Sequence, residues 1–183
     1  HGAAGRMGKR LVALGTSDPE LQLVAAIEHP QHPDLGRDAG GLAGVAEADV
    51  PLSSGLDFSA DAVIDFSLPD SAMALLRSCV TQKRALVLAT TGMTEEQKNE
   101  EAEAGQEITI VWAPKMSMAV NLTMKLAAIA GQTLNDAPGG ADVEIIERHH
   151  RYKEDAPSGT ALKFGELITE AMGQTKHQHG REG

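Results

Sequence analysis

Short apolar runs recur along the first part of the chain, and stretches with helical spacing alternate with them. Continuous apolar runs of this kind are typical of strands that are buried on both faces of a parallel sheet. The runs are Leu21–Ile27, Ala62–Phe66, Ala85–Ala89 and Ile108–Val111.

Helical patterns lie between these runs. The first predicted helix, Met7–Leu14, follows a glycine-rich turn, and the second, Ser71–Val80, places its larger apolar side chains on one stripe. The third begins with a capping-box pattern at Thr94 and continues to about Ala104. This alternation predicts an α/β fold, a doubly wound sheet of the Rossmann type with right-handed crossovers.

The pattern changes at two places. Residues 29–56 are rich in Gly, Pro and Asp, and we expect them to be mostly loop. After Val111 the sequence predicts a long helix at Val120–Leu134, a break near Pro138, and a strand at Asp142–Glu147. We therefore expect two domains, 1–118 and 119–183, with the boundary near Ser117–Val120.

The amino-acid composition limits the functions that we expect of this chain. The chain has 183 residues, 42% of them apolar but only 3% aromatic, so we expect an aliphatic core. A net charge of −10 argues against nucleic-acid binding, which depends on a basic surface. The single cysteine, Cys79, lies in an apolar helical pattern and is expected to be structural. With no membrane-length apolar run and no leader pattern, we expect a soluble cytoplasmic protein.

The chain opens inside the glycine-rich turn and stops in a polar stretch. A strand normally precedes such a turn. We therefore expect this chain to be an internal part of a longer protein.

Gly2-x-x-Gly5-x-x-Gly8 at a strand-to-helix turn favours a dinucleotide pyrophosphate, because glycines let the backbone approach the phosphates. Glu28 ends the next predicted strand, where a carboxylate would accept hydrogen bonds from the adenosine ribose. The alternative is a tight turn and a solvated Glu. His29 could contact a 2′-phosphate but is mostly neutral at pH 7, so the cofactor is NADH or NADPH with a preference for NADH.

Two loops follow predicted strands and are candidates for the nicotinamide side of the site, since ligands bind at the carboxyl ends of such strands. Plain turns are the alternative. The loops are Ala89-Thr90-Thr91-Gly92 and Trp112-Ala113-Pro114-Lys115-Met116.

The densest chemistry lies between Glu147 and Thr160, where histidines, cations and carboxylates precede a helix start at Ser158. A helix start offers unpaired N–H groups to an anion. A metal site at His149 and His150 is one alternative, although adjacent strand residues point to opposite faces. Another alternative is that the charged side chains of this cluster are exposed to solvent and bind nothing. We favour a substrate site, in which His149 and Lys153 donate protons and Gly159 and Thr160 bind a carboxylate.

The segment Glu144–Leu162 resembles the sequence motif of the 4-hydroxy-tetrahydrodipicolinate reductase family, also called dihydrodipicolinate reductase. The glycine turn, Thr90-Thr91-Gly92 and Ser117–Leu122 are similar to the same family in the same order. Ala89, Lys115 and His29 depart from the pattern, where Gly, Asn and Arg are usual.

The resemblance implies a Rossmann-type domain, an α+β substrate domain whose open sheet builds a homotetramer, and reduction of a cyclic imine dicarboxylate with NADH or NADPH in diaminopimelate and lysine biosynthesis. His149 and Lys153 match the catalytic pair, and His150, Ser158, Gly159 and Thr160 match substrate contacts. The cofactor contacts matched are Gly2, Ala3, Ala4, Gly5, Arg6, Met7, Glu28, His29, Ala89, Thr90, Thr91, Ala113, Pro114, Lys115 and Met116.

Two other functions stay open on the residues alone. One is a metal-dependent hydrolase that uses His149, His150 and Glu147. The other is a non-catalytic NAD-binding module, in which replacing His149 or Lys153 has no effect. We expect a small-molecule dicarboxylate as the ligand, and no metal, nucleic acid or membrane.

Overall fold

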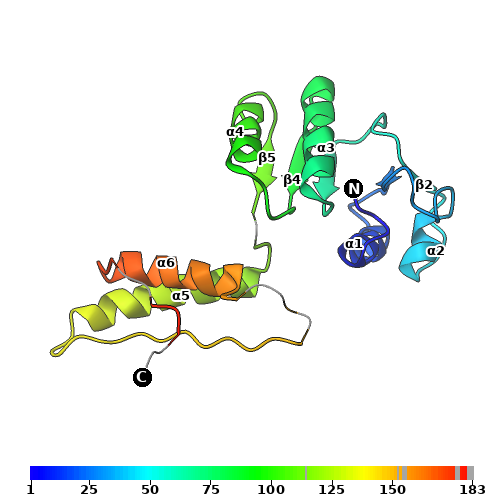
Figure 1. The fold of residues 1–183 in the computed structure, drawn as a ribbon. Helices are drawn as coiled ribbons and strands as arrows, with labels where there is room; N and C mark the ends of the chain where they lie inside the picture. The colour runs from blue at the N-terminus through cyan, green and yellow to red at the C-terminus, as the bar shows by residue number, and fades with distance from the viewer. Residues whose placement is uncertain (114, 152, 154–155, 176–177, 181–183) are drawn as a thin grey trace. The chain divides into compact units, whose positions relative to one another are not determined.

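The computed structural model describes residues 1–113, 115–151, 153, 156–175 and 178–180 (Figure 1). The chain divides into two compact units, His1–Pro114 and Lys115–Gly183, and each is described by itself. The candidate Pro114 lies outside the described residues, as do Tyr152, Glu154 and Asp155 of the charged cluster.

The first unit contains two parallel sheets. One pairs β1 (Ala26–Ile27) with β2 (Leu52–Ser53), and the other has the order β3 (Ala62–Asp65), β4 (Ala85–Leu88) and β5 (Ile110–Trp112).

Residues 1 and 2 join these two sheets. The His1 nitrogen donates to the Ile64 carbonyl at 2.8 Å and the Phe66 N–H donates to the His1 carbonyl at 3.1 Å. On the other side, the Gly2 N–H donates to the Ile27 carbonyl at 2.9 Å. Residues 1 and 2 therefore lie between β1 and β3, at the position of the central strand in a doubly wound sheet. The α/β class expected from the alternating pattern is confirmed.

Helices α1 (Arg6–Ser17), α2 (Ala39–Ala43), α3 (Pro69–Gln82) and α4 (Glu95–Ala104) complete the first unit. The largest core cluster packs α3 against β3 and β4 through aliphatic side chains such as Leu75, Leu76, Leu86 and Leu88. Cys79 is buried in this cluster. The capping box at the start of α4 is present as predicted, with Thr94 and Gln97 each accepting from the other's backbone N–H.

One expectation for this unit was wrong in detail. The strand predicted at Leu21–Ile27 shrinks to Ala26–Ile27, because its partner β2 is only two residues long. Residues 29–56 are mostly loop, as expected, and also contain the short elements α2 and β2. This region is organised by Asp38, whose side chain accepts hydrogen bonds from the N–H groups of Gly41, Ala48 and Val50. Such polar capping leaves no apolar periodicity in a sequence.

The second unit is built on α5 (Met118–Asn135) and α6 (Gly159–Ala171), which pack against each other. Met124, Ile168 and Met172 are buried there. A side chain on Gly131 would come within 3.2 Å of Met172, so the glycine permits the close approach of the helices. None of the described helices is long and apolar enough to cross a membrane.

The strand predicted at Asp142–Glu147 is absent from the structure. The segment runs extended beside the helices (Figure 1), but no residue of 141–150 has a strand partner among the described residues. A strand requires such a partner for its ladder of hydrogen bonds. The segment lies against α6, since Val143, Glu144, Ile145 and Glu147 line a cavity of about 450 Å³ beside this helix, whereas Ile146 is 80% exposed.

Candidate active site

The glycine turn has little space at its first and third glycines. Gly2 has a φ of 76°, and a Cβ there would lie 2.6 Å from the Phe66 carbonyl oxygen. A Cβ on Gly8 would lie 2.1 Å from the Gly2 carbonyl oxygen, which is shorter than any allowed van der Waals contact. Gly2 therefore permits the turn, and Gly8 permits the packing of α1 against it.

The middle glycine has a different role. Gly5 is exposed, and the nearest atom to an added Cβ is 3.2 Å away. It is the N-cap of α1 and has no side chain to satisfy the first N–H groups of the helix. Arg6 and Met7 in this first turn are exposed. The turn thus presents unpaired N–H groups and the positive end of the helix to solvent, an arrangement that fits a pyrophosphate.

Glu28 follows β1 and lies against this turn. Its Oε2 accepts from the Ala4 N–H at 3.0 Å, and its Oε1 accepts from the His29 N–H at 2.9 Å. Both carboxylate oxygens are therefore held in place with lone pairs to spare, as the ribose-binding acid of a dinucleotide site requires. His29 is exposed beside it.

The loop after β4 is also near the carboxyl end of the sheet. The Ala89 N–H donates to the Asp65 carbonyl at 3.0 Å, and the Thr90 hydroxyl donates to the Asp65 carboxylate. Thr90 is buried and Thr91 is exposed. Thr90 can therefore meet a ligand through its backbone, while Thr91 can also offer its side chain.

The loop after β5 is divided between the two units. The Ala113 N–H donates to the Leu88 carbonyl at 3.3 Å in the first unit. In the second unit, the Lys115 carbonyl accepts from the Asn121 side chain at 2.9 Å, and Met116 is 40% exposed.

In the second unit, Glu147 brings two of the predicted site residues together. Its Oε2 lies 2.8 Å from His149 Nε2, and its Oε1 accepts from the Ser158 N–H at 2.8 Å. Hydrogen bonds from the Ser158 hydroxyl, from His149 and from the Ser158 backbone lower the pKa of Glu147 to about 2. Glu147 is therefore ionised at neutral pH, and it orients both the imidazole and the start of α6.

The helix start predicted at Ser158 is present. Ser158 is the N-cap of α6, and its buried hydroxyl accepts from the Ala161 N–H at 3.2 Å. The N–H groups of Gly159 and Thr160 have no acceptor among the residues that the structure describes. They are suitable donors to a carboxylate.

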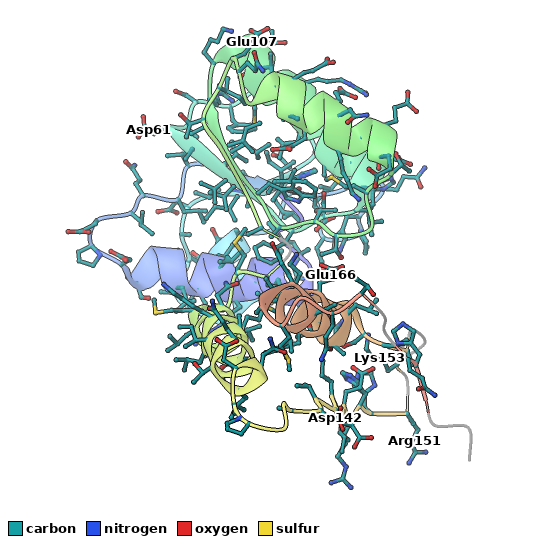
Figure 2. All side chains as sticks on the ribbon, turned by 90° about the vertical axis from the view of Figure 1, so that its left-hand side faces the viewer. Asp61, Glu107, Asp142, Arg151, Lys153 and Glu166 are labelled. Carbon is teal, nitrogen blue, oxygen red and sulfur yellow. The ribbon has the colours of Figure 1, made fainter. Side chains whose placement is uncertain are left out.

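The remaining basic residues come from the connection between α5 and α6. The Lys153 N–H donates to the His150 carbonyl at 3.2 Å, which makes a turn between them. Figure 2 shows Arg151 and Lys153 on this connection, and Asp142 on its earlier part, closer in sequence to α5.

The described residues contain no group of three or more His, Cys, Asp or Glu that could hold a metal ion.

Sequence reasoning missed two residues of structural weight in these sites. Asp65 was included only as part of a predicted strand, and the only role given to Glu147 itself was that of a metal ligand. The signal for Asp65 was a carboxylate near the end of an apolar run, where parallel strands meet the ligand crevice. The signal for Glu147 was its position two residues before His149, on the same side of an extended chain.

Three features together define a class: a glycine turn that suits a dinucleotide, an acid placed to accept from a ribose, and a separate unit with an imidazole beside a helix start that suits an anion. They are the parts of a nicotinamide-dependent oxidoreductase that acts on an anionic small molecule.

Comparisons with known proteins specify the member of that class. The family model described as "Dihydrodipicolinate reductase, N-terminus" matches residues 1–116, and the one described as "Dihydrodipicolinate reductase, C-terminus" matches residues 119–182. The chain is 55% identical to the 4-hydroxy-tetrahydrodipicolinate reductase of Rhodopirellula baltica and 48% identical to that of Pseudomonas fluorescens. It aligns over its whole length with 68% and 69% of those proteins.

A solved structure is similar as well. The dipicolinate-bound dihydrodipicolinate reductase from Paenisporosarcina sp. matches with a TM-score of 0.75 and 29% identity, over the whole chain and 68% of that structure.

The chain belongs to the dihydrodipicolinate reductase family. These enzymes are NAD(P)H-dependent oxidoreductases of diaminopimelate and lysine biosynthesis, and they reduce 4-hydroxy-tetrahydrodipicolinate to tetrahydrodipicolinate. The comparisons support neither the metal-dependent hydrolase nor the non-catalytic module.

Proposed function

We propose a division of labour between the two units for this reduction. Unit 1 binds the nicotinamide cofactor through the glycine turn, Glu28 and the loops after β4 and β5. Unit 2 binds the cyclic imine dicarboxylate and supplies the proton. The proposal extends the family assignment to individual side chains.

The observation that carries the proposal is the double contact of Glu147 with His149 and Ser158. One carboxylate fixes an imidazole and a helix start whose N–H groups suit an anion. A substrate carboxylate on Gly159 and Thr160 is then held near His149, within the same few residues of chain. Lys153 adds positive charge and His150 adds a polar ring nitrogen, which suits a dicarboxylate.

The residue types in unit 2 suit the chemistry of this reduction. Loss of the 4-hydroxyl group as water leaves a conjugated imine. Hydride, which the bound cofactor would supply, adds to this imine and builds negative charge on the substrate. Lys153 is cationic and donates the proton that quenches this charge, with His149 as its partner in proton transfer. Since Glu147 accepts a hydrogen bond from one ring nitrogen, the other ring nitrogen of His149 is available to the substrate.

For the cofactor, we propose a preference for NADH. Glu28 has both oxygens held by backbone N–H groups, and an ionised carboxylate there repels a 2′-phosphate. His29 is the side chain that could offset this repulsion in part. Ratios of kcat/KM for NADH and NADPH measure the preference, and replacing Glu28 with Gln shifts the ratio toward NADPH.

The central test is a steady-state assay of the complete protein. The substrate is the condensation product of pyruvate and aspartate semialdehyde, and oxidation of the nicotinamide cofactor is the readout. His149→Gln and Lys153→Met are expected to lower kcat by roughly 10²–10⁴-fold, the usual contribution of a positioned proton donor.

Lys163→Met is the matched control, because Lys163 is a lysine of the same unit whose ion pair with Glu166 is exposed. It is expected to leave kcat unchanged. A wild-type rate that survives both site replacements would contradict the assignment. Activity that disappears with a chelator would instead favour the metal-dependent alternative.

We also propose that the protein is a cytoplasmic homotetramer. The exposed apolar side chain of Ile146, on an extended segment that has no strand partner among the described residues, supports association through further strands. Light scattering after size exclusion tests the stoichiometry.

A further inference from the structure

Asp65 is an unusual residue for the interior of unit 1, because its side chain is completely buried. Its Oδ1 lies 2.6 Å from His1 Nδ1 and accepts from the Ser67 hydroxyl at 2.7 Å, and its Oδ2 accepts from the Thr90 hydroxyl. A buried carboxylate is stable only when its oxygens are paired in this way.

The partners of Asp65 come from separate parts of the cofactor crevice. His1 directly precedes the glycine turn, Ser67 follows β3, and Thr90 belongs to the loop after β4. Backbone hydrogen bonds join the same segments. The Phe66 N–H donates to the His1 carbonyl, and the Ala89 N–H donates to the Asp65 carbonyl. One carboxylate therefore ties the glycine turn to the Thr90 loop.

The His1 ring is held at both nitrogens. Nδ1 faces Asp65, and Nε2 lies 3.2 Å from the Ser71 hydroxyl in α3. Burial alone would raise the pKa of Asp65, but hydrogen bonds from His1, Thr90 and Ser67 outweigh it and hold that pKa below its ordinary value. Asp65 is thus a carboxylate at neutral pH, and its partners donate to it.

We propose that Asp65, His1 and Thr90 act as a positioning group for the cofactor. Their side chains set the separation between the glycine turn and the Thr90 loop without touching the cofactor themselves. These loops hold the pyrophosphate and the nicotinamide side under the function proposed above, on which this inference rests. Loss of one hydrogen bond in the group lets the two loops move apart, so cofactor affinity falls while proton transfer in unit 2 is unaffected.

The geometry of Thr90 supports this role over a direct one. Its hydroxyl donates to Asp65, and its side chain is buried. Thr91, the next residue, is exposed. The sequence thus pairs one threonine that anchors the loop with one that faces solvent at the crevice end of the sheet.

The test is a pair of replacements at Thr90 in the complete protein. Thr90→Val keeps the shape and removes the hydroxyl, and Thr90→Ser keeps the hydroxyl. A buried acceptor left without its donor costs on the order of 1–3 kcal/mol, which corresponds to roughly 5- to 150-fold in an equilibrium constant. We expect Thr90→Val to raise the Kd and KM of the nicotinamide cofactor roughly tenfold, and Thr90→Ser to restore them to within about twofold.

The expected kinetic pattern separates positioning from mere stability. The KM of the dicarboxylate substrate and the kcat at saturating cofactor are expected to stay near wild type. Ser78→Ala is the matched control, since the Ser78 hydroxyl also makes a partly buried hydrogen bond in unit 1, to the Leu56 carbonyl. It is expected to lower the thermal midpoint and leave the cofactor Kd unchanged.

His1→Ala provides a second measurement should Thr90→Val fail to fold. It is expected to raise the cofactor Kd, and the double variant is expected to raise it by less than the product of the two single effects, because both act through Asp65. The inference is overturned if wild type reduces the substrate but Thr90→Val, or in its place His1→Ala, keeps the wild-type cofactor Kd. Absence of reduction by wild type overturns the proposed function instead.

Discussion

The ionisation of Glu147 makes the stability of the folded protein depend on pH. Its pKa is about 2 in the folded protein against a reference value of 4.5, so folding favours the ionised form. The stabilisation is fully present above pH 4.5 and is lost as the pH falls toward 2. Glu147→Gln removes it.

We therefore expect wild type to be more stable than Glu147→Gln at pH 6, and the difference to shrink as the pH falls from 4.5 toward 2. Urea denaturation of both proteins across this range measures it. A difference that stays constant between these limits would show that the charge of Glu147 does not contribute.

Among the elements, α1 depends on glycine at one position and not at another. A Cβ on Gly8 would lie 2.1 Å from the Gly2 carbonyl oxygen, whereas a Cβ on Gly15 in the same helix meets nothing within 4 Å. Gly8→Ala is expected to cost roughly 1–3 kcal/mol and to weaken cofactor binding, because α1 must shift away from the turn.

Gly15→Ala is the control in the same helix. It is expected to stabilise the protein by roughly 0.5–1 kcal/mol, since alanine favours a helix interior over glycine. Denaturation and cofactor titration of the two variants test the pair. Equal effects at both positions would contradict the packing role of Gly8.

The N-caps of α4 and α6 offer a second comparison. Thr94 and Ser158 both accept a hydrogen bond from the first turn of their helix, and each replacement by Ala is expected to cost roughly 1 kcal/mol of stability. Only Ser158→Ala is expected to raise the KM of the dicarboxylate, because it also removes the hydrogen bond from the Ser158 hydroxyl to Glu147. Stability and KM are measured on both; a rise in substrate KM with Thr94→Ala would refute the distinction.

Local signals in the sequence were sufficient for elements that local interactions determine. The capping box at Thr94, the helix start at Ser158 and the buried helix around Cys79 depend on neighbouring residues, and all are present. The strand at 142–147 failed because a strand depends on a partner that no local pattern supplies.

The same reasoning explains what was predictable in the site. The glycine spacing and the helix start are local, and the sequence placed both. The contacts of Asp65 with His1 and Thr90 join residues 64 and 25 positions apart, and only the folded sheet brings them together. Long-range polar contacts of this kind leave no periodic trace in a sequence.

At the level of the whole molecule, the proposed tetramer makes Ile146 the residue to test. Its side chain is 80% exposed, while its neighbour Ile145 lines the cavity against α6. An aspartate at position 146 places a charge where further strands are proposed to pack, and a charge buried without a partner is costly.

Ile146→Asp is therefore expected to dissociate the assembly, with light scattering after size exclusion giving a mass below four subunits. Leu21→Asp is the control, because Leu21 is also an exposed apolar residue, 61% accessible, but lies in unit 1. It is expected to leave the mass unchanged, since an isolated exposed leucine is ordinary on a protein surface. A tetramer that persists with Ile146→Asp would exclude this segment from the interface, and a monomeric wild type would exclude the tetramer itself.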